Sequence, residues 1–337
     1  MKINTAGRSA LIAVIEKFPQ QHIVLLGDLV ADEFVYGEIA RVSREAPVLI
    51  LKERERQIVP GGGANAANNL VEMEARVTLV GGVGDDEAGE ALLAYFQQKE
   101  VSTSRVIKAP GYSTPMKSRI LGGLSHWQRQ QIVRVDREPA QGLDRKARRK
   151  LSASVVPLLS KASALLVSDY GFGSTDAQEV EYLRQRAGNQ PLPMTVDSRY
   201  DLLKFAHLTA ATPNEPELEA AYGRKIGNNL ELLHQLGQKT LRRQWLRALL
   251  VTRGRDGMVL FESRRKPEHI PIFGSDQVTD VTGAGDTVMA AFTLALAAGA
   301  TFLQAAQLAN CAGGLVVMKR GTATVGRREL EEAIRNA

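Results

Sequence analysis

The sequence predicts an α/β fold: a doubly wound, mostly parallel sheet with helices on both faces, plus a small β-sheet lid. Runs such as ALLV at 164–167 and LLVT at 249–252 are apolar throughout, as burial on both faces of a parallel sheet requires. Helical segments separate these runs, which is typical of βαβ units. β-rich segments interrupt the pattern and predict the lid. With 337 residues, 44% of them apolar, the chain is long enough to bury a large core.

The first elements of the chain are a helix over 9–17 and a short buried strand at 23–26, which ends at Gly27-Asp28. The lid is predicted from two pairs of segments, at about 34–60 and 112–136. FVYGEIARV and PVLILKERERQIV form the first pair, and PMKSRIL and QQIVRVD, joined by GGLSHWQR, form the second. Apolar and polar residues partly alternate in these segments, so we expect a sheet with one wet face.

The rest of the chain alternates strands with helices. No linker rich in Pro, Gly or Ser divides it, so we expect a single domain over 1–337. The basic run at 145–150 lacks interleaved aromatic residues and predicts the solvated face of a helix. The expected strands lie at 77–84, 164–171, 193–198, 208–215, 248–254 and 257–261, and the expected helices at 87–100, 176–187 and 286–298.

The composition bounds the possible partners. Lys and Arg number 43 against 37 Asp and Glu, a mild excess that suits an anionic substrate as well as it suits nucleic acid. Aromatic residues make up 5% of the chain, so we expect no stacking surface for nucleic acid. The single cysteine, Cys311, excludes an intramolecular disulfide and a cysteine-based zinc site. The sequence contains neither a signal peptide nor a bilayer-spanning stretch, so we expect a cytoplasmic protein.

The strongest local motif is DVTGAGD at 280–286, directly before a helix of small residues. Gly283, Ala284 and Gly285 allow backbone N–H groups to approach an anion, and the helix dipole adds positive charge there. Asp286 in the first turn either caps the helix or serves as a general base beside this anion hole.

A second motif is GGGANAANN at 61–69. It matches the G-x-G-x-x-A dinucleotide fingerprint, but Pro60 and the charged KERER segment argue against a buried parallel strand before it. Alternatively, the glycines bring the backbone close to a sugar while the Asn65 amide binds vicinal hydroxyls. The loop can also be a simple turn.

A third motif, Asn214-Glu215-Pro216-Glu217, follows an apolar segment, at the edge of the sheet where ligands of open α/β folds bind. Glu217 either holds Mg²⁺ through water or belongs to a helix N-cap. The sequence contains no G-x-x-x-x-G-K-[ST] and no G-x-S-x-G, and its five histidines lack ligand spacing. P-loop NTPases, hydrolases and zinc enzymes therefore lose support.

Together, GGGANAANN, TPNEPE and DVTGAGDT resemble the ribokinase-like (PfkB) carbohydrate kinase family over nearly the whole chain. The early motif departs at Glu74, where the family usually has Gly or Ser. Since Glu in a left-handed conformation is strained, we expect that turn to be rebuilt. Alternatives are another PfkB-type carbohydrate or nucleoside kinase, and a non-catalytic sugar or nucleotide sensor on this fold. An NAD-dependent dehydrogenase has only the glycine match in its favour.

Within that family, GDLVADEFVYG and ARVSREAPV are similar to the kinase domain of ADP-heptose synthesis enzymes. Those domains phosphorylate D-glycero-D-manno-heptose 7-phosphate at the anomeric oxygen. Arg44 and Asp197-Ser198-Arg199 depart from the subgroup, which commonly has Pro and Asp-Pro-Lys there. The sequence ends at Ala337, so we expect a stand-alone kinase without the adenylyltransferase domain that many relatives carry.

The resemblance implies an ATP-dependent sugar-phosphate kinase that uses Mg²⁺. The lid strands would expose edges, and pairing them between subunits is one way to cover them, so we expect a homodimer. Lys117 and Arg119 on the lid are our candidates for binding the 7-phosphate, because a remote dianion needs fixed cations. The alternative is that both are plain surface charges of the lid. The roles implied for matching residues are Asp286 as base, Gly283, Ala284 and Gly285 as anion hole, Asp32, Gly62, Gly63 and Asn65 at the sugar, Asn214 and Glu217 at the ATP–Mg²⁺ phosphates, and Thr252 and Gly254 near the nucleotide.

Overall fold

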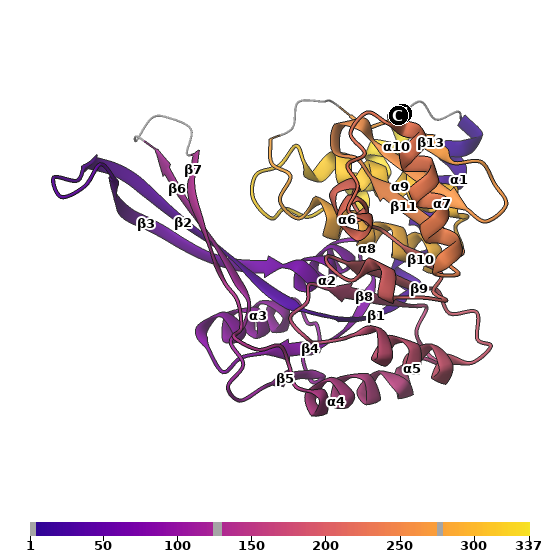
Figure 1. Ribbon diagram of the computed structural model, residues 1–337, viewed down its shortest axis with the longest axis horizontal. Coiled ribbons are helices and arrows are strands. Elements are labelled where there is room, and N and C mark those ends of the chain that lie inside the picture. Colours follow the sequence, from indigo (N-terminus) through magenta and orange to yellow (C-terminus); the bar gives the residue numbers. More distant parts are fainter. Residues whose placement is uncertain (1–4, 124–129, 275–278) are drawn as a thin grey trace.

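The computed structural model describes residues 5–123, 130–274 and 279–337. Within these residues, nine strands form the main sheet: β1 (His22–Gly27), β4 (Arg76–Val83), β5 (Val106–Lys108), β8 (Ala164–Asp169), β9 (Met194–Ser198), β10 (Ala210–Ala211), β11 (Ala248–Thr252), β12 (Met258–Glu262) and β13 (Glu268–Ile270). Their order is β13-β12-β11-β10-β9-β8-β1-β4-β5 (Figure 1). The strands from β11 to β5 are parallel, and β12 and β13 add an antiparallel edge.

Helices cover both faces of the main sheet, as the apolar strands predicted. Along β1, Ile23 and Leu25 belong to one hydrophobic core, and Val24 and Leu26 belong to the other. This alternation explains why strands with no polar face are stable here. The first core is completed by α1 (Thr5–Ile15), α2 (Gly62–Glu72), α3 (Glu87–Gln98), α8 (Ala284–Ala297), α9 (Phe302–Val316) and α10 (Arg327–Arg335), and the second by α4 (Arg145–Val155), α5 (Ala177–Ala187), α6 (Glu215–Tyr222) and α7 (Leu230–Arg243).

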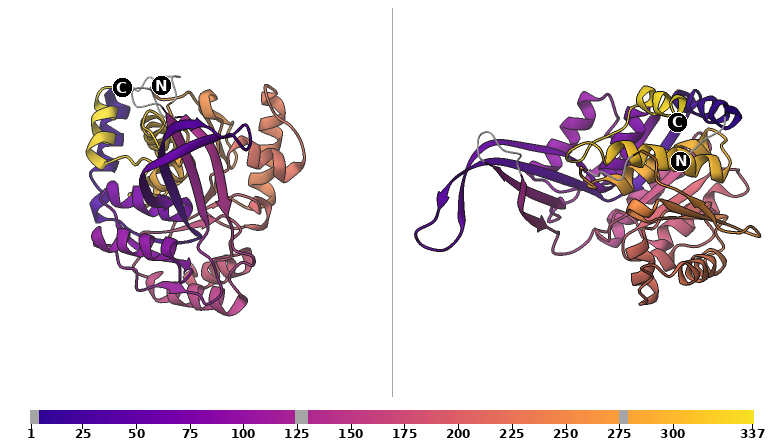
Figure 2. Two further views of the ribbon diagram at one scale, coloured as in Figure 1. Left: turned by 90° about the vertical axis from the view of Figure 1, so that its left-hand side faces the viewer. Right: turned by 90° about the horizontal axis from the view of Figure 1, so that it is seen from above.

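A smaller sheet, which we call the lid sheet, projects from the body (Figure 2). Its strands are β2 (Leu29–Val42), β3 (Leu49–Gly61), β6 (Met116–Gly123) and β7 (Gln130–Arg137), in the order β3-β2-β6-β7. The expected connection between β6 and β7 includes residues 124–129, which lie outside the described residues. Strand β2 begins at Leu29, five residues before the expected position, because only Asp28 separates it from β1.

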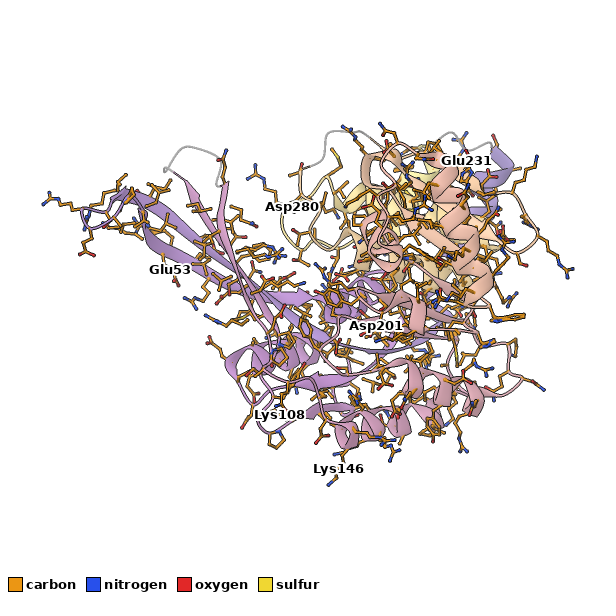
Figure 3. The ribbon with its side chains drawn as sticks, viewed as in Figure 1. Glu53, Lys108, Lys146, Asp201, Glu231 and Asp280 are labelled. Atoms are coloured by element: carbon orange, nitrogen blue, oxygen red, sulfur yellow. The ribbon has the colours of Figure 1, made fainter. Side chains whose placement is uncertain are left out.

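The outer part of the lid sheet differs from the expected sheet with one wet face. All eight residues of β7 are exposed, and so are residues 52–57 of β3. Glu53, labelled in Figure 3, lies in this outer part. No core covers either face of the outer strands in the described part of the protein.

The turn after α2 corrects a second expectation. Glu74 keeps the left-handed conformation, with φ of 65°, and the turn is not rebuilt. The Ala75 N–H donates to the Leu70 carbonyl and the Glu74 N–H donates to the Val71 carbonyl, which is the pattern of a Schellman motif. The Glu74 carboxylate also accepts a 2.7 Å bond from Arg327 on α10. These contacts offset the strain of a left-handed Glu.

Across the described residues, no helix combines the length and the apolar character needed to cross a bilayer.

Candidate active site

The first turn of α8 lies at the carboxyl ends of the parallel strands. Gly283 takes the N-cap position with φ of 76°, and a Cβ there would lie 2.5 Å from Nδ2 of Asn65, so only glycine fits. At Gly285 a Cβ would meet no atom within 4 Å, so the space beside this backbone is open. Asp280, labelled in Figure 3, holds the preceding loop by accepting bonds from the N–H groups of Thr282 and Gly321. An anion can therefore approach the start of α8.

Asp286, in this first turn, is held by two donors. The Tyr170 hydroxyl donates to Oδ1 over 2.8 Å, and Nδ2 of Asn65 donates to Oδ2 over 3.0 Å. The side chain is buried, and this burial raises the pKa of Asp286 to about 6, against the opposing effect of the two donors. A carboxylate with this pKa can accept a proton near neutral pH.

Asn65 is fully buried, and its amide is used within the protein. Besides Asp286, it donates to the Gly283 carbonyl at 3.4 Å, and its Oδ1 accepts from Nδ2 of Asn69. The structure thus places Asn65 behind the Asp286 carboxylate and not on an open surface facing a ligand. The motif at 61–69 joins α2 to α8 through this contact.

The glycines of the same motif serve close packing. The Gly63 N–H donates to the Asp28 carbonyl, and a Cβ on Gly62 would lie 2.8 Å from Val30 and 3.2 Å from Tyr170. The strand before α2 is β3, which pairs antiparallel with β2 in the lid sheet. A dinucleotide fingerprint needs a parallel βαβ unit, so this context removes the support for an NAD site.

Asp32 on β2 and Arg119 on β6 form a buried ion pair. A guanidinium nitrogen of Arg119 lies 2.6 Å from Oδ1 of Asp32, and the Thr322 hydroxyl donates to Oδ2 over 2.7 Å. The Arg119 guanidinium also lies 5.4 Å from the centre of the Phe34 ring. Of the two lid cations expected at a substrate phosphate, Arg119 is therefore already neutralised.

Lys117 is placed differently from Arg119. Its Nζ lies 4.9 Å from the centre of the Tyr170 ring, and the Arg199 guanidinium lies 6.0 Å from the same centre. Burial and the nearby Arg199 charge lower the pKa of Lys117. Two cations thus gather at the ring whose hydroxyl contacts Asp286.

Tyr170 and Asp28 received no role from the sequence. Asp28 is fully buried, and its carboxylate accepts bonds from the backbone N–H groups of Tyr170, Phe172 and Ser174. It shapes the turn that points Tyr170 at Asp286. The available signal was an acidic residue directly after an apolar strand, together with a Tyr in a glycine-rich turn after a second apolar strand.

Asn214 and Glu217 form a capping box at the start of α6. The Asn214 N–H donates to Glu217 over 2.9 Å, and the Glu217 N–H donates to Oδ1 of Asn214 over 2.8 Å. The helix-cap interpretation therefore describes the observed geometry. Burial nevertheless raises the pKa of Glu217 to about 7, and burial together with the charges of Glu217 and Asp286 raises the pKa of Asp197 on β9. Two half-buried carboxyl groups with raised pKa values thus lie at this point of the site.

A cavity of about 520 Å³, which we call the α8 cavity, lies beside these groups. Five of the predicted site residues line it: Asn214, Thr252, Gly254, Ala284 and Gly285. Its volume suits a ligand of nucleotide size. The described residues contain no group of three or more His, Cys, Asp or Glu arranged to hold a metal ion.

Residues 21–328 match the family described as pfkB family carbohydrate kinase. The chain is 35% identical over 328 residues to the bifunctional protein HldE of Magnetococcus marinus, which covers 96% of this chain and 66% of that protein. It is 38% identical over 308 residues to the bifunctional protein HldE of Geobacter metallireducens, with 91% and 61% covered. The chain spans less than two thirds of the length of either relative.

In fold, the chain is similar to phosphofructokinase-2 from Escherichia coli in complex with potassium, with a TM-score of 0.74 and 18% identity, over 94% of this chain and 98% of that one. Ribokinase from Arabidopsis thaliana complexed with ribose and ATP gives a TM-score of 0.70 and 20% identity, with the same coverage. These likenesses confirm the ribokinase-like α/β fold with its smaller sheet.

Proposed function

Because this chain belongs to the pfkB family of carbohydrate kinases, we propose that it transfers a phosphoryl group from ATP to the anomeric oxygen of D-glycero-D-manno-heptose 7-phosphate. The product is the 1,7-bisphosphate. The similarity to the two bifunctional HldE proteins, over most of this chain, supports the heptose assignment. The cations Lys117 and Arg199 beside the base support a substrate that already carries a phosphate.

In the proposed reaction, the Asp286 carboxylate accepts the proton of the anomeric hydroxyl as its oxygen attacks the γ-phosphoryl group of ATP. The bonds from Tyr170 and Asn65 keep this carboxylate in one orientation. Ala284 and Gly285 line the α8 cavity, and their backbone, together with that of Gly283 at the N-cap, is the proposed anion hole for the charge that develops on the transferred group.

Mg²⁺ fits the carboxyl groups at the phosphate end of the site. Asp197 and Glu217 are half-buried carboxyls with raised pKa values, and a divalent cation bound with the nucleotide phosphates would relieve their repulsion. Such an ion supplies charge neutralisation for the phosphates. Glu217 would act through the waters of the ion, because one of its oxygens already caps α6.

Asp32, Gly62 and Gly63 are the proposed contacts of the sugar. The two oxygens of Asp32 each accept one bond within the protein, which leaves lone pairs for substrate hydroxyls. Arg119 is the buried counter-ion of this carboxylate. We therefore assign the 7-phosphate to Lys117 and Arg199, and assign Arg119 to support of Asp32.

The lid sheet is the proposed interface of a homodimer. Six apolar side chains with exposed fractions of 41–58% gather on it: Val42, Val48, Leu49, Ile132, Val133 and Val135. Pairing of two lid sheets would cover these side chains and the exposed strand edges. Light scattering should give a dimer mass, and replacing Ile132 and Val133 with Asp should give monomers, whereas Tyr182→Asp on α5 should not.

A substrate panel tests the proposed function. Production of ADP is measured with heptose 7-phosphate, fructose 6-phosphate, ribose and adenosine at equal concentrations. We expect the heptose phosphate to give the highest kcat/KM. A clear preference for an unphosphorylated sugar would contradict the heptose 7-phosphate assignment and leave the carbohydrate kinase activity intact.

A further inference from the structure

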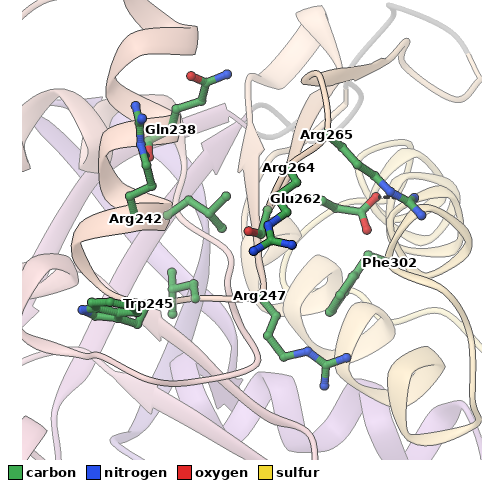
Figure 4. A pocket seen from close by; sticks show the side chains of 11 residues that line it. Gln238, Arg242, Trp245, Arg247, Glu262, Arg264, Arg265 and Phe302 are labelled. Carbon is green, nitrogen blue, oxygen red and sulfur yellow. Dashed lines mark hydrogen bonds and ion pairs between the residues drawn. The ribbon is translucent and has the colours of Figure 1, made fainter.

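A large hollow lies at the opposite ends of strands β11 and β12 from the α8 cavity, and Figure 4 shows the residues that line it. Strands β11 and β12 connect the two places: Thr252 and Met258 line the α8 cavity, while Arg247 and Glu262 line the hollow. The hollow has a volume of about 1040 Å³, and we call it the arginine hollow. Its side chains come from α7, the loop between α7 and β11, the turn between β12 and β13, and the start of α9, and include Arg242, Trp245, Arg247, Arg264, Arg265 and Phe302.

The charges around the arginine hollow are unbalanced. It is lined by four arginines and one acidic residue, Glu262, which pairs with Arg265 at 3.2 Å. Among the described residues, no carboxylate lies within ion-pair distance of Arg242, Arg247 or Arg264. The Arg247 guanidinium rests 5.5 Å from the centre of the Phe302 ring, which limits its motion. Guanidinium groups so placed match the oxygens of phosphate groups.

The exposed indole ring of Trp245 lines the hollow together with these arginines. The Trp245 side chain is 71% exposed, which is unusual for an indole. One of its faces stacks on the His207 ring, with centroids 6.0 Å apart and planes within 16°. Because most of the indole is exposed, a planar ring could extend this stack on the face away from His207.

The end of α7 directs Trp245 toward the hollow. The Trp245 N–H donates to the Arg242 carbonyl and the Leu246 N–H donates to the Leu241 carbonyl, which is the pattern of a Schellman motif. The left-handed conformation of Trp245, with φ of 52°, is therefore that of a helix end. The indole that follows α7 lines the hollow.

We propose that the arginine hollow binds a nucleoside polyphosphate at a site separate from the kinase reaction. The base stacks on the open face of Trp245, and the phosphates contact Arg242, Arg247 and Arg264. A base alone would contact only the Trp245 ring, and phosphates alone would contact only the arginines. The proposal does not depend on which sugar the kinase phosphorylates.

Trp245 itself reports on binding. The sequence has two tryptophans, so Trp127→Phe leaves Trp245 as the single indole. Titration of this protein with ADP should quench its fluorescence with saturation. Pyrophosphate, which lacks a base, and adenosine, which lacks phosphates, should each require a concentration at least about tenfold higher. Calorimetry should count two ADP sites per chain.

Single-residue variants test whether ADP binding at the arginine hollow is independent of nucleotide binding in the α8 cavity. Arg264→Ala and Arg242→Ala should each weaken the quench about tenfold, because each removes a charge-assisted contact. Both should keep the wild-type KM for ATP, which also shows that they fold. Arg243→Ala is the matched control, since Arg243 is exposed on α7 but does not line the hollow. A quench unchanged in the two variants, a single ADP site by calorimetry, or no quench at concentrations that saturate the kinase would each overturn the proposal.

Discussion

The hydroxyl of Tyr170 donates a 2.8 Å hydrogen bond to the Asp286 carboxylate, although the two residues lie 116 positions apart in the sequence. The ring that carries this hydroxyl has Lys117 and Arg199 as its cationic neighbours. Tyr170 therefore links the proposed base to the proposed phosphate site. Removing the hydroxyl would abolish the hydrogen bond to Asp286 and keep the aromatic ring beside Lys117 and Arg199.

Tyr170→Phe should shift the acid limb of the kcat/KM profile to higher pH by about one unit. The hydroxyl stabilises the ionised form of Asp286, so its loss raises the pKa of that carboxyl above about 6. The measurement is kcat/KM between pH 5 and 9. Tyr200→Phe is the control, because its hydroxyl contacts Arg199 and not Asp286. An identical acid limb in both variants would show that Tyr170 has only a packing role.

Asp286→Asn should lower kcat by about 10²–10⁴-fold, which is the usual contribution of a positioned base. ATP and sugar binding should stay close to wild type, since Asn has the same shape and can keep a bond to Tyr170. Single-turnover kinetics and calorimetry measure the two effects separately. Near-normal turnover would refute the assignment of the base.

Glu217→Gln should raise the Mg²⁺ concentration needed for half-maximal activity. The substitution removes the charge, and Gln still accepts the bond from the Asn214 N–H, so the cap of α6 survives. Asn214→Ala provides the opposite change, with the carboxylate kept and one capping bond lost. If the Mg²⁺ titration of Glu217→Gln matches that of the wild type, Glu217 is a capping residue alone.

Arg119→Ala and Lys117→Ala should affect different properties. Loss of Arg119 leaves the Asp32 carboxylate buried without its counter-ion, so the free energy of unfolding should fall by about 3–5 kcal/mol. Loss of Lys117 should instead reduce the preference for the phosphorylated heptose over its dephosphorylated form by about tenfold. Urea unfolding and paired kcat/KM values measure these effects. If both variants lost the preference for the phosphorylated heptose to the same extent, Arg119 would also be assigned to binding of the 7-phosphate.

The ligand-free protein should become more stable as the pH falls from 8 to 6. Burial raises the pKa values of Asp169 and Asp286 to about 6 and that of Glu217 to about 7. The folded state then binds more protons than the unfolded state in this range, so stability decreases as pH rises. Urea midpoints at the two pH values test this sign. Mg²⁺ with a nucleotide should reduce the difference, and a higher midpoint at pH 8 without ligand would contradict the prediction.

The sequence predicted the features that depend on contiguous residues. The apolar runs of β8 and β11, the lid segments and the start of α8 at the DVTGAGD motif were each visible as local patterns. The three-residue strands β5 and β13 were not expected, because three residues are too few to show the hydrophobic alternation of a strand. Helices α9 and α10 also lie beyond the last helix that was expected.

Side-chain partners could not be read from the sequence. Arg119 was expected to face a phosphate, but the register of β2 and β6 sets it beside the Phe34 backbone and within reach of Asp32. Asn65 was expected to face a sugar, but helix α2 packs against α8 and turns its amide toward Asp286. Both outcomes depend on which elements become neighbours in space, and local patterns contain no information on that.

The direct passage from β1 into β2 has a mechanical consequence. A strand of 14 residues is at most about 45 Å long, so a tilt of about 5° at Asp28 would displace Val42 by about 4 Å and Asp32 by only about 1 Å. The far end of the strand can thus swing widely while the carboxylate near its base stays almost in place. A partner molecule that bound the far end of the lid sheet could therefore move that end by several ångströms while shifting Asp32, at the proposed sugar site, by only about 1 Å.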